Sequence, residues 1–235
     1  DKGFTLLELL IVIAIIAILA IALVFMLNPA ETLKKARDAQ RISDLKTVKT
    51  ALGIMLTATS TPSLDGTFGA SVPRVCSTGG DGTIAALGVG KIAYSTGTAP
   101  AVTSTALVGS DTSATSFATS VAMTGTAAGA VDGTGWIPVK LKALTGGTPI
   151  SAFPVDPTNS VGATAAATDL VYRYTCQNAS NVAGKPAYVF EIDAVLESQA
   201  YKIDDPKMAN DGGDNTNMYE SGNSLNLLPT TGAAF

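Results

Sequence analysis

The feature that most limits how this chain can fold is a long apolar run close to its N-terminus. Phe4–Leu27 holds 24 residues, and Thr5 and Glu8 are the only polar ones among them. As a helix rising about 1.5 Å per residue, the run reaches about 36 Å, enough to cross a bilayer hydrocarbon core of about 30 Å. A secretory signal peptide has a shorter apolar region with a small-residue cleavage site after it. Here a charged helical pattern follows, so residues 4–27 are expected to remain as a transmembrane helix.

Glu8 makes this helix more than a plain anchor. A carboxylate among leucines in lipid costs several kcal/mol unless it finds a partner, so an acid inside a membrane span is a candidate functional site. Lys2, Gly3 and Phe4 precede it, and Glu8 follows Phe4 by four positions. This pattern of a basic residue, a glycine, a phenylalanine and a glutamate resembles the processing site of type IV prepilins, the precursors of pilins and pseudopilins.

The resemblance implies how the N-terminus is processed. A membrane aspartyl peptidase, the prepilin peptidase, would cut between Gly3 and Phe4, and the new Phe4 amine would be N-methylated. Residues 1–3 are then the remnant of a leader. Glu8 would pair with the terminal amine of a subunit already assembled, which fixes the axial register of the helices. If residues 1–3 persist, Lys2 is the alternative cation for Glu8 of a neighbour.

The helix is expected to continue beyond the membrane, through residues 28–58. Asn28 is a good N-cap, Pro29 suits the first helical position, and Glu31 completes a capping-box-like start. Pro29 also interrupts the preceding helix, because it lacks a backbone N–H and crowds the preceding turn, so a kink is expected near residues 25–29. Apolar residues then recur at steps of three and four and predict a stripe that packs on a globular domain, with solvated charges opposite. The stripe comprises Leu33, Ala36, Ile42, Leu45, Val48, Leu52 and Met55.

Residues 59–235 are expected to form a β-rich globular head. Ser, Thr, Ala and Gly dominate residues 59–135, which are interpreted as an insertion with short strands, and residues 136–235 as the sheet and a C-terminal loop. Trp136–Leu141, Leu170–Cys176 and Ala187–Val195 alternate in polarity as strands do, and the last two predict an antiparallel hairpin. The predicted fold is therefore α+β: a long N-terminal helix, kinked near Pro29, on a small antiparallel sheet.

The chain contains two cysteines, Cys76 and Cys176. A pair in an exported protein most simply forms one disulfide, which here would tie the insertion to the sheet. The alternative is two buried free thiols. The spacing offers no metal-binding or redox motif of the CxxC kind.

A glycine-bent acidic segment near the C-terminus is a candidate calcium site. Carboxylate and amide oxygens suit a hard cation such as Ca²⁺, although the spacing does not match an EF-hand. The alternative is a polar surface turn, and no cofactor is required by the rest of the sequence. The candidate ligands are Asp211, Asp214, Asn215, Asn217 and Glu220.

Composition argues against an enzyme. There is no histidine, the commonest general base, and no base–nucleophile pair stands out. With a formal net charge of −4, the chain has no electrostatic footprint for nucleic acid. The resemblance implies a homo-oligomer, inserted in the inner membrane before the pilus assembly machinery moves it into an extracellular bacterial filament. Two alternatives stay open: a pseudopilin of a type II secretion system and a membrane-anchored monomeric adhesin.

Overall fold

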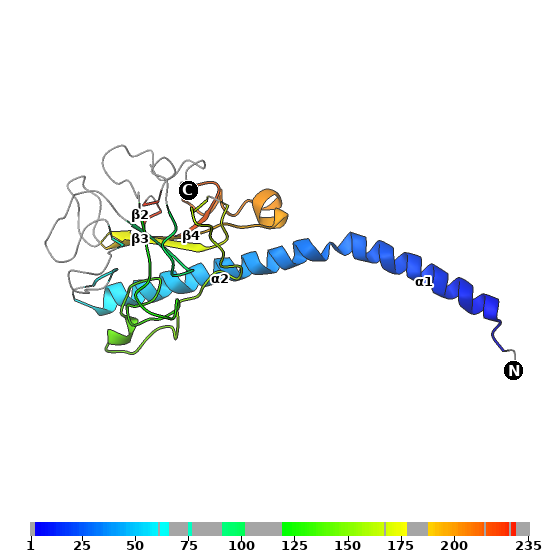
Figure 1. Cartoon of the computed structure of the whole chain (residues 1–235), viewed down its shortest axis with the longest axis horizontal. Helices are drawn as coiled ribbons and strands as arrows, with labels where there is room; N and C mark the ends of the chain where they lie inside the picture. The colour runs from blue at the N-terminus through cyan, green and yellow to red at the C-terminus, as the bar shows by residue number, and fades with distance from the viewer. Residues whose placement is uncertain are drawn as a thin grey trace.

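The structure is a computed structural model of the chain. It contains an N-terminal helical arm and a head built on one sheet (Figure 1). The residues that it describes are 3–60, 62–65, 75–76, 91–101, 119–166, 168–177, 188–213, 215–225 and 227–228.

Two helices follow each other along the arm. Helix α1, Leu6–Leu27, and helix α2, Pro29–Ala58, are separated by Asn28 alone. Asn28 has φ 37° and ψ 71°, a left-handed conformation that asparagine tolerates better than most residues, and it caps both helices. Its side-chain oxygen accepts a hydrogen bond from the Glu31 amide at 3.4 Å. The helix break expected near residues 25–29 therefore falls at Asn28, with Pro29 opening the second helix.

The head contains a five-stranded sheet in the order β2-β1-β3-β4-β5. The predicted α+β class is confirmed, because this sheet and the long N-terminal helix are separate layers. The strands are β1 (Lys91–Tyr94), β2 (Thr119–Val121), β3 (Tyr172–Gln177), β4 (Val189–Ala194) and β5 (Tyr219–Gly222).

The predicted hairpin is the centre of this sheet. Strands β3 and β4 pair in antiparallel register, with Tyr172 opposite Ala194 and Gln177 opposite Val189. Both strands are buried along their whole length. The expected connection, around residues 178–187, lies outside the described residues. The alternation in the sequence therefore located the strands, but it did not reveal that both faces are covered.

We had expected an antiparallel sheet, but one of its strand pairs is parallel. Strand β1 pairs with β3 in antiparallel fashion but with β2 in parallel, with Ile92 opposite Ser120. A parallel pair needs a connection of about a dozen residues or more, and residues 95–118 provide it. Both β1 and β2 come from the segment 59–135, so the region interpreted as an insertion supplies two of the strands.

The prediction of a strand at Trp136–Leu141 is wrong. Residues 136 and 137 form a bend and residues 138 and 139 belong to no strand. Lys140 makes one isolated bridge to Asp132, and a short 3₁₀ helix, η2, covers Leu141–Ala143. Pro138 has no backbone N–H to give to a strand ladder. The alternating pattern instead reflects burial, since the apolar side chains of this segment enter the core.

The main core lies between α2 and the sheet. One face of α2 contributes apolar side chains that meet the inward side chains of the central strands and Trp136. The Trp136 ring lies 6.5 Å from that of Tyr174, edge to face, and its indole N–H donates to the Pro154 carbonyl at 3.0 Å. The other face of the sheet carries a smaller cluster. On α2, the buried apolar residues are Leu45, Val48, Ala51, Leu52 and Met55.

Cys76 and Cys176 form a disulfide that closes a loop with a sequence separation of 100. Cys176 belongs to β3, and both cysteines are buried in the main core. The bond therefore attaches a segment that leaves α2 to the centre of the sheet, as expected from the cysteine count.

Replacing both cysteines, Cys76→Ser with Cys176→Ser, should lower the free energy of unfolding by about 2–5 kcal/mol, because the unfolded chain gains the entropy that the cross-link removes. Denaturant unfolding of the full-length chain in detergent, followed by circular dichroism, measures this. Reductant should shift the wild type towards the double variant and leave the variant unchanged. Equal unfolding midpoints for the two proteins without reductant would contradict the expectation.

Candidate functional site

The expected cleavage bond lies just ahead of the first helix. Gly3, Phe4 and Thr5 are not helical, and α1 begins at Leu6. The Phe4 side chain is 85% exposed. No other heavy atom lies within 4 Å of the position where a β-carbon of Gly3 would stand. The bond between Gly3 and Phe4 is therefore in an open, non-helical segment, which is the form in which a peptidase can bind a chain.

Glu8 takes part in a capping box at the start of α1. The Glu8 amide donates to the Thr5 hydroxyl at 3.2 Å, and the Thr5 amide donates to Oε2 of Glu8 at 3.2 Å. The Thr5 hydroxyl also donates to Oε2 at 3.1 Å. The negative carboxylate thus lies at the positive end of its own helix dipole. The threonine three positions before a glutamate is a sequence signature of this motif, and our sequence interpretation did not use it. Lys2, the alternative cation, lies outside the described residues.

Helix α1 carries large apolar side chains on every side. Each of those described, from Leu6 to Met26, is about half exposed or more. In Figure 1, α1 extends away from the head, and no described part of the head lies beside it. By length and composition, the helical run from Leu6 to Ala58 includes a stretch able to cross a membrane, near the N-terminus. So much apolar surface without a partner is not stable in water, so it needs lipid or other helices.

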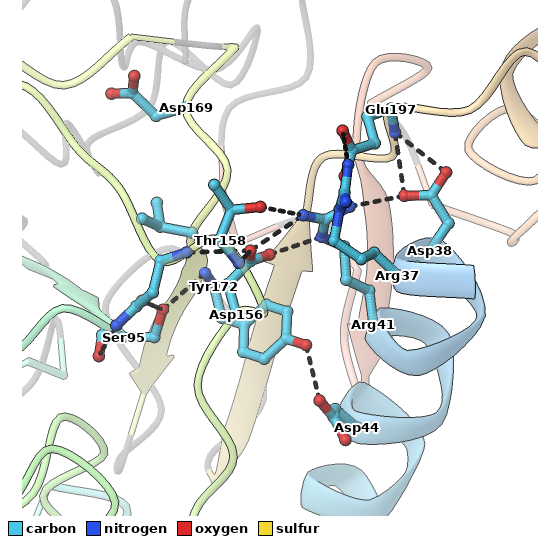
Figure 2. Close-up of polar contacts among 12 residues, drawn as sticks. Arg37, Asp38, Arg41, Asp44, Ser95, Asp156, Thr158, Asp169, Tyr172 and Glu197 are labelled. Atoms are coloured by element: carbon cyan, nitrogen blue, oxygen red, sulfur yellow. Dashed lines mark hydrogen bonds and ion pairs between the residues drawn. The ribbon is translucent and has the colours of Figure 1, made fainter. Parts of the chain in front are cut away.

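Arg41 joins α2 to the head. Its guanidinium is completely buried, and its Nε and Nη2 donate to the two oxygens of Asp156 at 2.7 and 3.0 Å (Figure 2). Its Nη1 donates to Asp38, one turn earlier on α2, at 2.7 Å and to Glu197 at 2.9 Å. Thr158 accepts a further hydrogen bond from Nη2 at 3.2 Å. A planar guanidinium suits such paired carboxylates better than a lysine does.

Asp38 and Glu197 extend this joint. Asp38 accepts hydrogen bonds from the backbone amides of Glu197 and Ser198, the shortest at 2.7 Å. The Arg37 guanidinium donates hydrogen bonds to both carboxylate oxygens of Glu197, at 2.6 and 2.9 Å. Both segments of the head that meet α2 here are thus held by charged groups from the helix (Figure 2). We name the group Arg37, Asp38, Arg41, Asp156 and Glu197 the α2–head joint.

The charges of the joint alter its pKa values. Hydrogen bonds from Arg37 and Arg41 lower the pKa of Glu197 to about 2, although partial burial acts in the opposite direction. Burial lowers the pKa of Arg41, but hydrogen bonds and the charges of its acidic partners outweigh it, and the net pKa is raised. Arg37, Arg41 and Glu197 are therefore charged at neutral pH.

The expectation that the charges of α2 are solvated is wrong for Asp38 and Arg41, which are both fully buried. The predicted apolar stripe is correspondingly too long. Leu33, which we had assigned to it, is 61% exposed, and the buried face of α2 becomes apolar only from Leu45 onward. The first turns of α2 bind the head through ion pairs, because acidic residues of the head meet them there.

The described candidate calcium ligands are linked to one another by backbone hydrogen bonds within the C-terminal loop. Asp211 uses its oxygens to accept the amides of Gly213 and Glu220, at 2.9 and 2.7 Å. Asn215 accepts the Asn217 amide at 3.0 Å. Asp214 lies outside the described residues. These contacts shape the loop, as in a polar turn, and the Glu220 carboxylate accepts the Asn215 amide of the same loop at 2.9 Å.

Glu220 also lies beside two acids of the neighbouring strand. Glu191, Asp193 and Glu220 each place a carboxylate oxygen within 4.8 Å of the others, and all three are buried. We name them the strand triad. Burial raises the pKa of Glu191 and Asp193 well above their ordinary values, and the neighbouring acids raise them further. Sequence reasoning missed Glu191 and Asp193, although their spacing of two in a strand puts both side chains on one face.

Residues 1–24 match the family model of the prokaryotic N-terminal methylation motif. This is the prepilin signal of type IV pilins and pseudopilins, so the resemblance read from the sequence is confirmed for this segment. Neither the comparison with curated proteins nor that with solved structures gave a match. The motif points to a structural protein rather than an enzyme family, and it implies a prepilin peptidase and pilus assembly. With the apolar helix, it fits a membrane-anchored precursor.

Replacing Arg41 by methionine should lower the free energy of unfolding by about 3–5 kcal/mol, because Asp38 and Asp156 would stay buried without their cation. Denaturant unfolding of the full-length chain in detergent measures this. Lys142→Met is the matched control: Lys142 approaches Asp132 at 3.8 Å with 64% of its side chain exposed, and water screens such a pair. Similar losses for the two variants would show that the joint adds no more than a surface pair.

The stability of the head should fall in acid partly through Glu197. Its pKa is about 2 in the folded chain against an ordinary 4.5, so its contribution is complete above about pH 4.5 and disappears as pH falls towards 2. Glu197→Gln should therefore flatten the dependence of unfolding free energy on pH between about 5 and 2. Parallel pH curves for the variant and the wild type would exclude this role.

Proposed function

We propose that this chain is a structural pilin subunit that polymerises through its N-terminal helix into a type IV pilus-like filament on the bacterial surface. Adhesion, motility or DNA uptake would be the task of that filament. The observation that carries the proposal is the prepilin motif of residues 1–24 on a helix that is apolar on every side and separate from the head.

The apolar surface of α1 supports polymerisation. Before assembly, lipid covers the 22 residues of α1, which span about 33 Å as a helix. Once the helix leaves the membrane, only other apolar helices can cover the same surface. Copies of the same chain supply them, and a bundle of identical helices then forms the filament core, with the heads outside.

Glu8 supplies the register of that bundle. Both hydrogen bonds that Thr5 gives to the carboxylate go to Oε2, so the other oxygen, Oε1, can accept the amine of a neighbouring Phe4. In an apolar bundle a charged carboxylate is stable only when it is paired, so axial offsets that leave Glu8 unpaired are disfavoured. The capping box fixes the position of the carboxylate at the start of the helix before the neighbouring amine binds.

The α2–head joint supports a role as a subunit that transmits tension along a filament. Because the ion pairs of Arg41 fix α2 to the head, a pull on the helix is passed to the sheet rather than to a flexible linker. A pseudopilin of a type II secretion system shares the prepilin motif and is the second candidate. The hydroxyl-rich composition of residues 59–135 favours a subunit displayed on the cell surface.

Electron microscopy and mass spectrometry of material sheared from cells test the proposal. Filaments made of this chain, with an N-methylated Phe4 as the first residue, are the expected result. A filament subunit that retains Lys2 would assign the pairing of Glu8 to that side chain instead. A chain found only in the membrane fraction would refute the filament and leave the membrane-anchored adhesin, and a short filament confined to the cell envelope would favour the pseudopilin.

Glu8→Gln should abolish filaments while the chain still inserts in the membrane. Glutamine at this position can keep the capping box, so the change removes the charge and little else. Thr5→Ala is the complementary control, because it removes the cap and keeps the charge, and it should leave filaments visible by electron microscopy. Filaments from Glu8→Gln at the wild-type level would rule out charge pairing as the register device.

A further inference from the structure

The strand triad lies on the face of the sheet opposite α2. Side chains alternate between the faces of a strand, so Phe190 and Ile192 of β4 point to the main core, and Glu191 and Asp193 point away from it. Glu220, opposite Asp193 in the β4–β5 register, points the same way. Three acids from two neighbouring strands therefore share one buried spot.

Within the described part of the chain, two acids of the triad, Glu191 and Asp193, have fewer hydrogen-bond donors than their oxygens can accept. Asp193 is fully buried, and neither of its carboxylate oxygens has a hydrogen-bond partner among the residues that the structure describes. Oε2 of Glu191 accepts the backbone amides of Leu227 and Leu228, at 2.6 and 3.2 Å, but Oε1 has no such partner within the same part of the chain. A buried ionised carboxylate without partners is strongly unfavourable, so something must neutralise these oxygens.

The charges do not balance within the described part of the chain. Arg173, directly opposite Asp193 in the β3–β4 register, is fully buried, and its positive charge acts on Asp193. Three ionised carboxylates and one guanidinium sum to −2, since −3 + 1 = −2. Either two protons or one divalent cation brings this buried group to neutrality.

We propose that the strand triad binds one Ca²⁺ ion. Calcium–oxygen bonds measure about 2.3–2.6 Å, so two ligands on opposite sides of the ion are about 4.6–5.2 Å apart. That span is the largest separation two ligands of one ion can have, and the triad oxygens, all within 4.8 Å of one another, are close enough to share one ion. Asp193 can bind through both oxygens, Glu191 through Oε1, and Glu220 completes the carboxylate set. The ligands are oxygen atoms alone, which suits a hard cation and not zinc.

The ion would fix the C-terminal part of the head. Glu191 already holds the amides of Leu227 and Leu228, and Glu220 accepts the amide of Asn215 at 2.9 Å. A β-carbon at Gly213 would overlap Oε2 of Glu220, so the loop passes directly over the triad. A cation that sets the positions of these carboxylates therefore also sets the loop and the last described turn of the chain.

This site differs from the one that the sequence suggested. Of the five candidate ligands, Glu220 is retained, and Asp211 and Asn215 shape the loop around it through backbone hydrogen bonds. The proposal depends on the head alone and does not rest on the proposed filament, because none of its residues lies in α1.

The test uses the full-length chain in detergent, stripped of metal with a chelator and titrated with CaCl₂. Calorimetry should show one Ca²⁺ per chain, and the melting temperature should rise by about 5–10 °C when Ca²⁺ is about 100-fold above its dissociation constant. Mg²⁺ at the same concentration should raise it much less, because magnesium demands a smaller octahedral site. No binding at millimolar Ca²⁺, with unchanged melting, would mean that protons neutralise the triad and would overturn the proposal.

Two variants locate the ion. Asp193→Asn keeps the side-chain shape and removes one charge, so it should fold without metal at least as well as the stripped wild type and show no Ca²⁺-dependent rise in melting temperature. Asn217→Ala, in the exposed part of the loop, should keep the full rise. The reverse pattern, with the response lost in Asn217→Ala and kept in Asp193→Asn, would place calcium in the loop and refute the strand site.

Discussion

The structure depends on one buried cation, the guanidinium of Arg41. It sits between its own helix and two separate segments of the head, and it receives two oxygens from Asp156 and one each from Asp38 and Glu197. A buried charge of this kind adds little net stability compared with an apolar contact, but it specifies geometry strictly, since any other placement of α2 would leave charges unpaired. The rotation and height of the helix against the sheet follow from these contacts.

The division of the long helix into two parts follows from the same logic. Towards the N-terminus, Lys35 and Glu31 still contact Tyr201 and Gln199, but no described part of the head lies beside α1, whose surface is apolar except for Glu8. One half of the arm is therefore specified by its own head, and the other half by whatever apolar surroundings cover it. The matched prepilin motif, residues 1–24, lies entirely on the side of Asn28 that the head does not cover.

Local features could be predicted from the sequence, and distant pairings could not. The apolar run, the break beside Pro29 and the hairpin of β3 and β4 follow from short-range periodicity and turn chemistry. The burial of Arg41 could not be predicted, because Asp156 lies 115 positions further along the chain. The parallel pairing of β1 with β2 and the meeting of Asp193 with Glu220 likewise depend on topology. The loop around Asp211 has the oxygen-rich composition of a cation site, but its hydrogen bonds are used to form the turn.

The break at Asn28 has a mechanical consequence. Because this one residue leaves the helical conformation, the angle between α1 and α2 is set by its two backbone dihedral angles, while the helices on either side stay stiff. In the proposed filament, every subunit would carry one torsional joint at the same height. Extension or bending would be divided into small rotations at many equivalent residues, so the polymer can be compliant as a whole while each core helix and each head remains rigid.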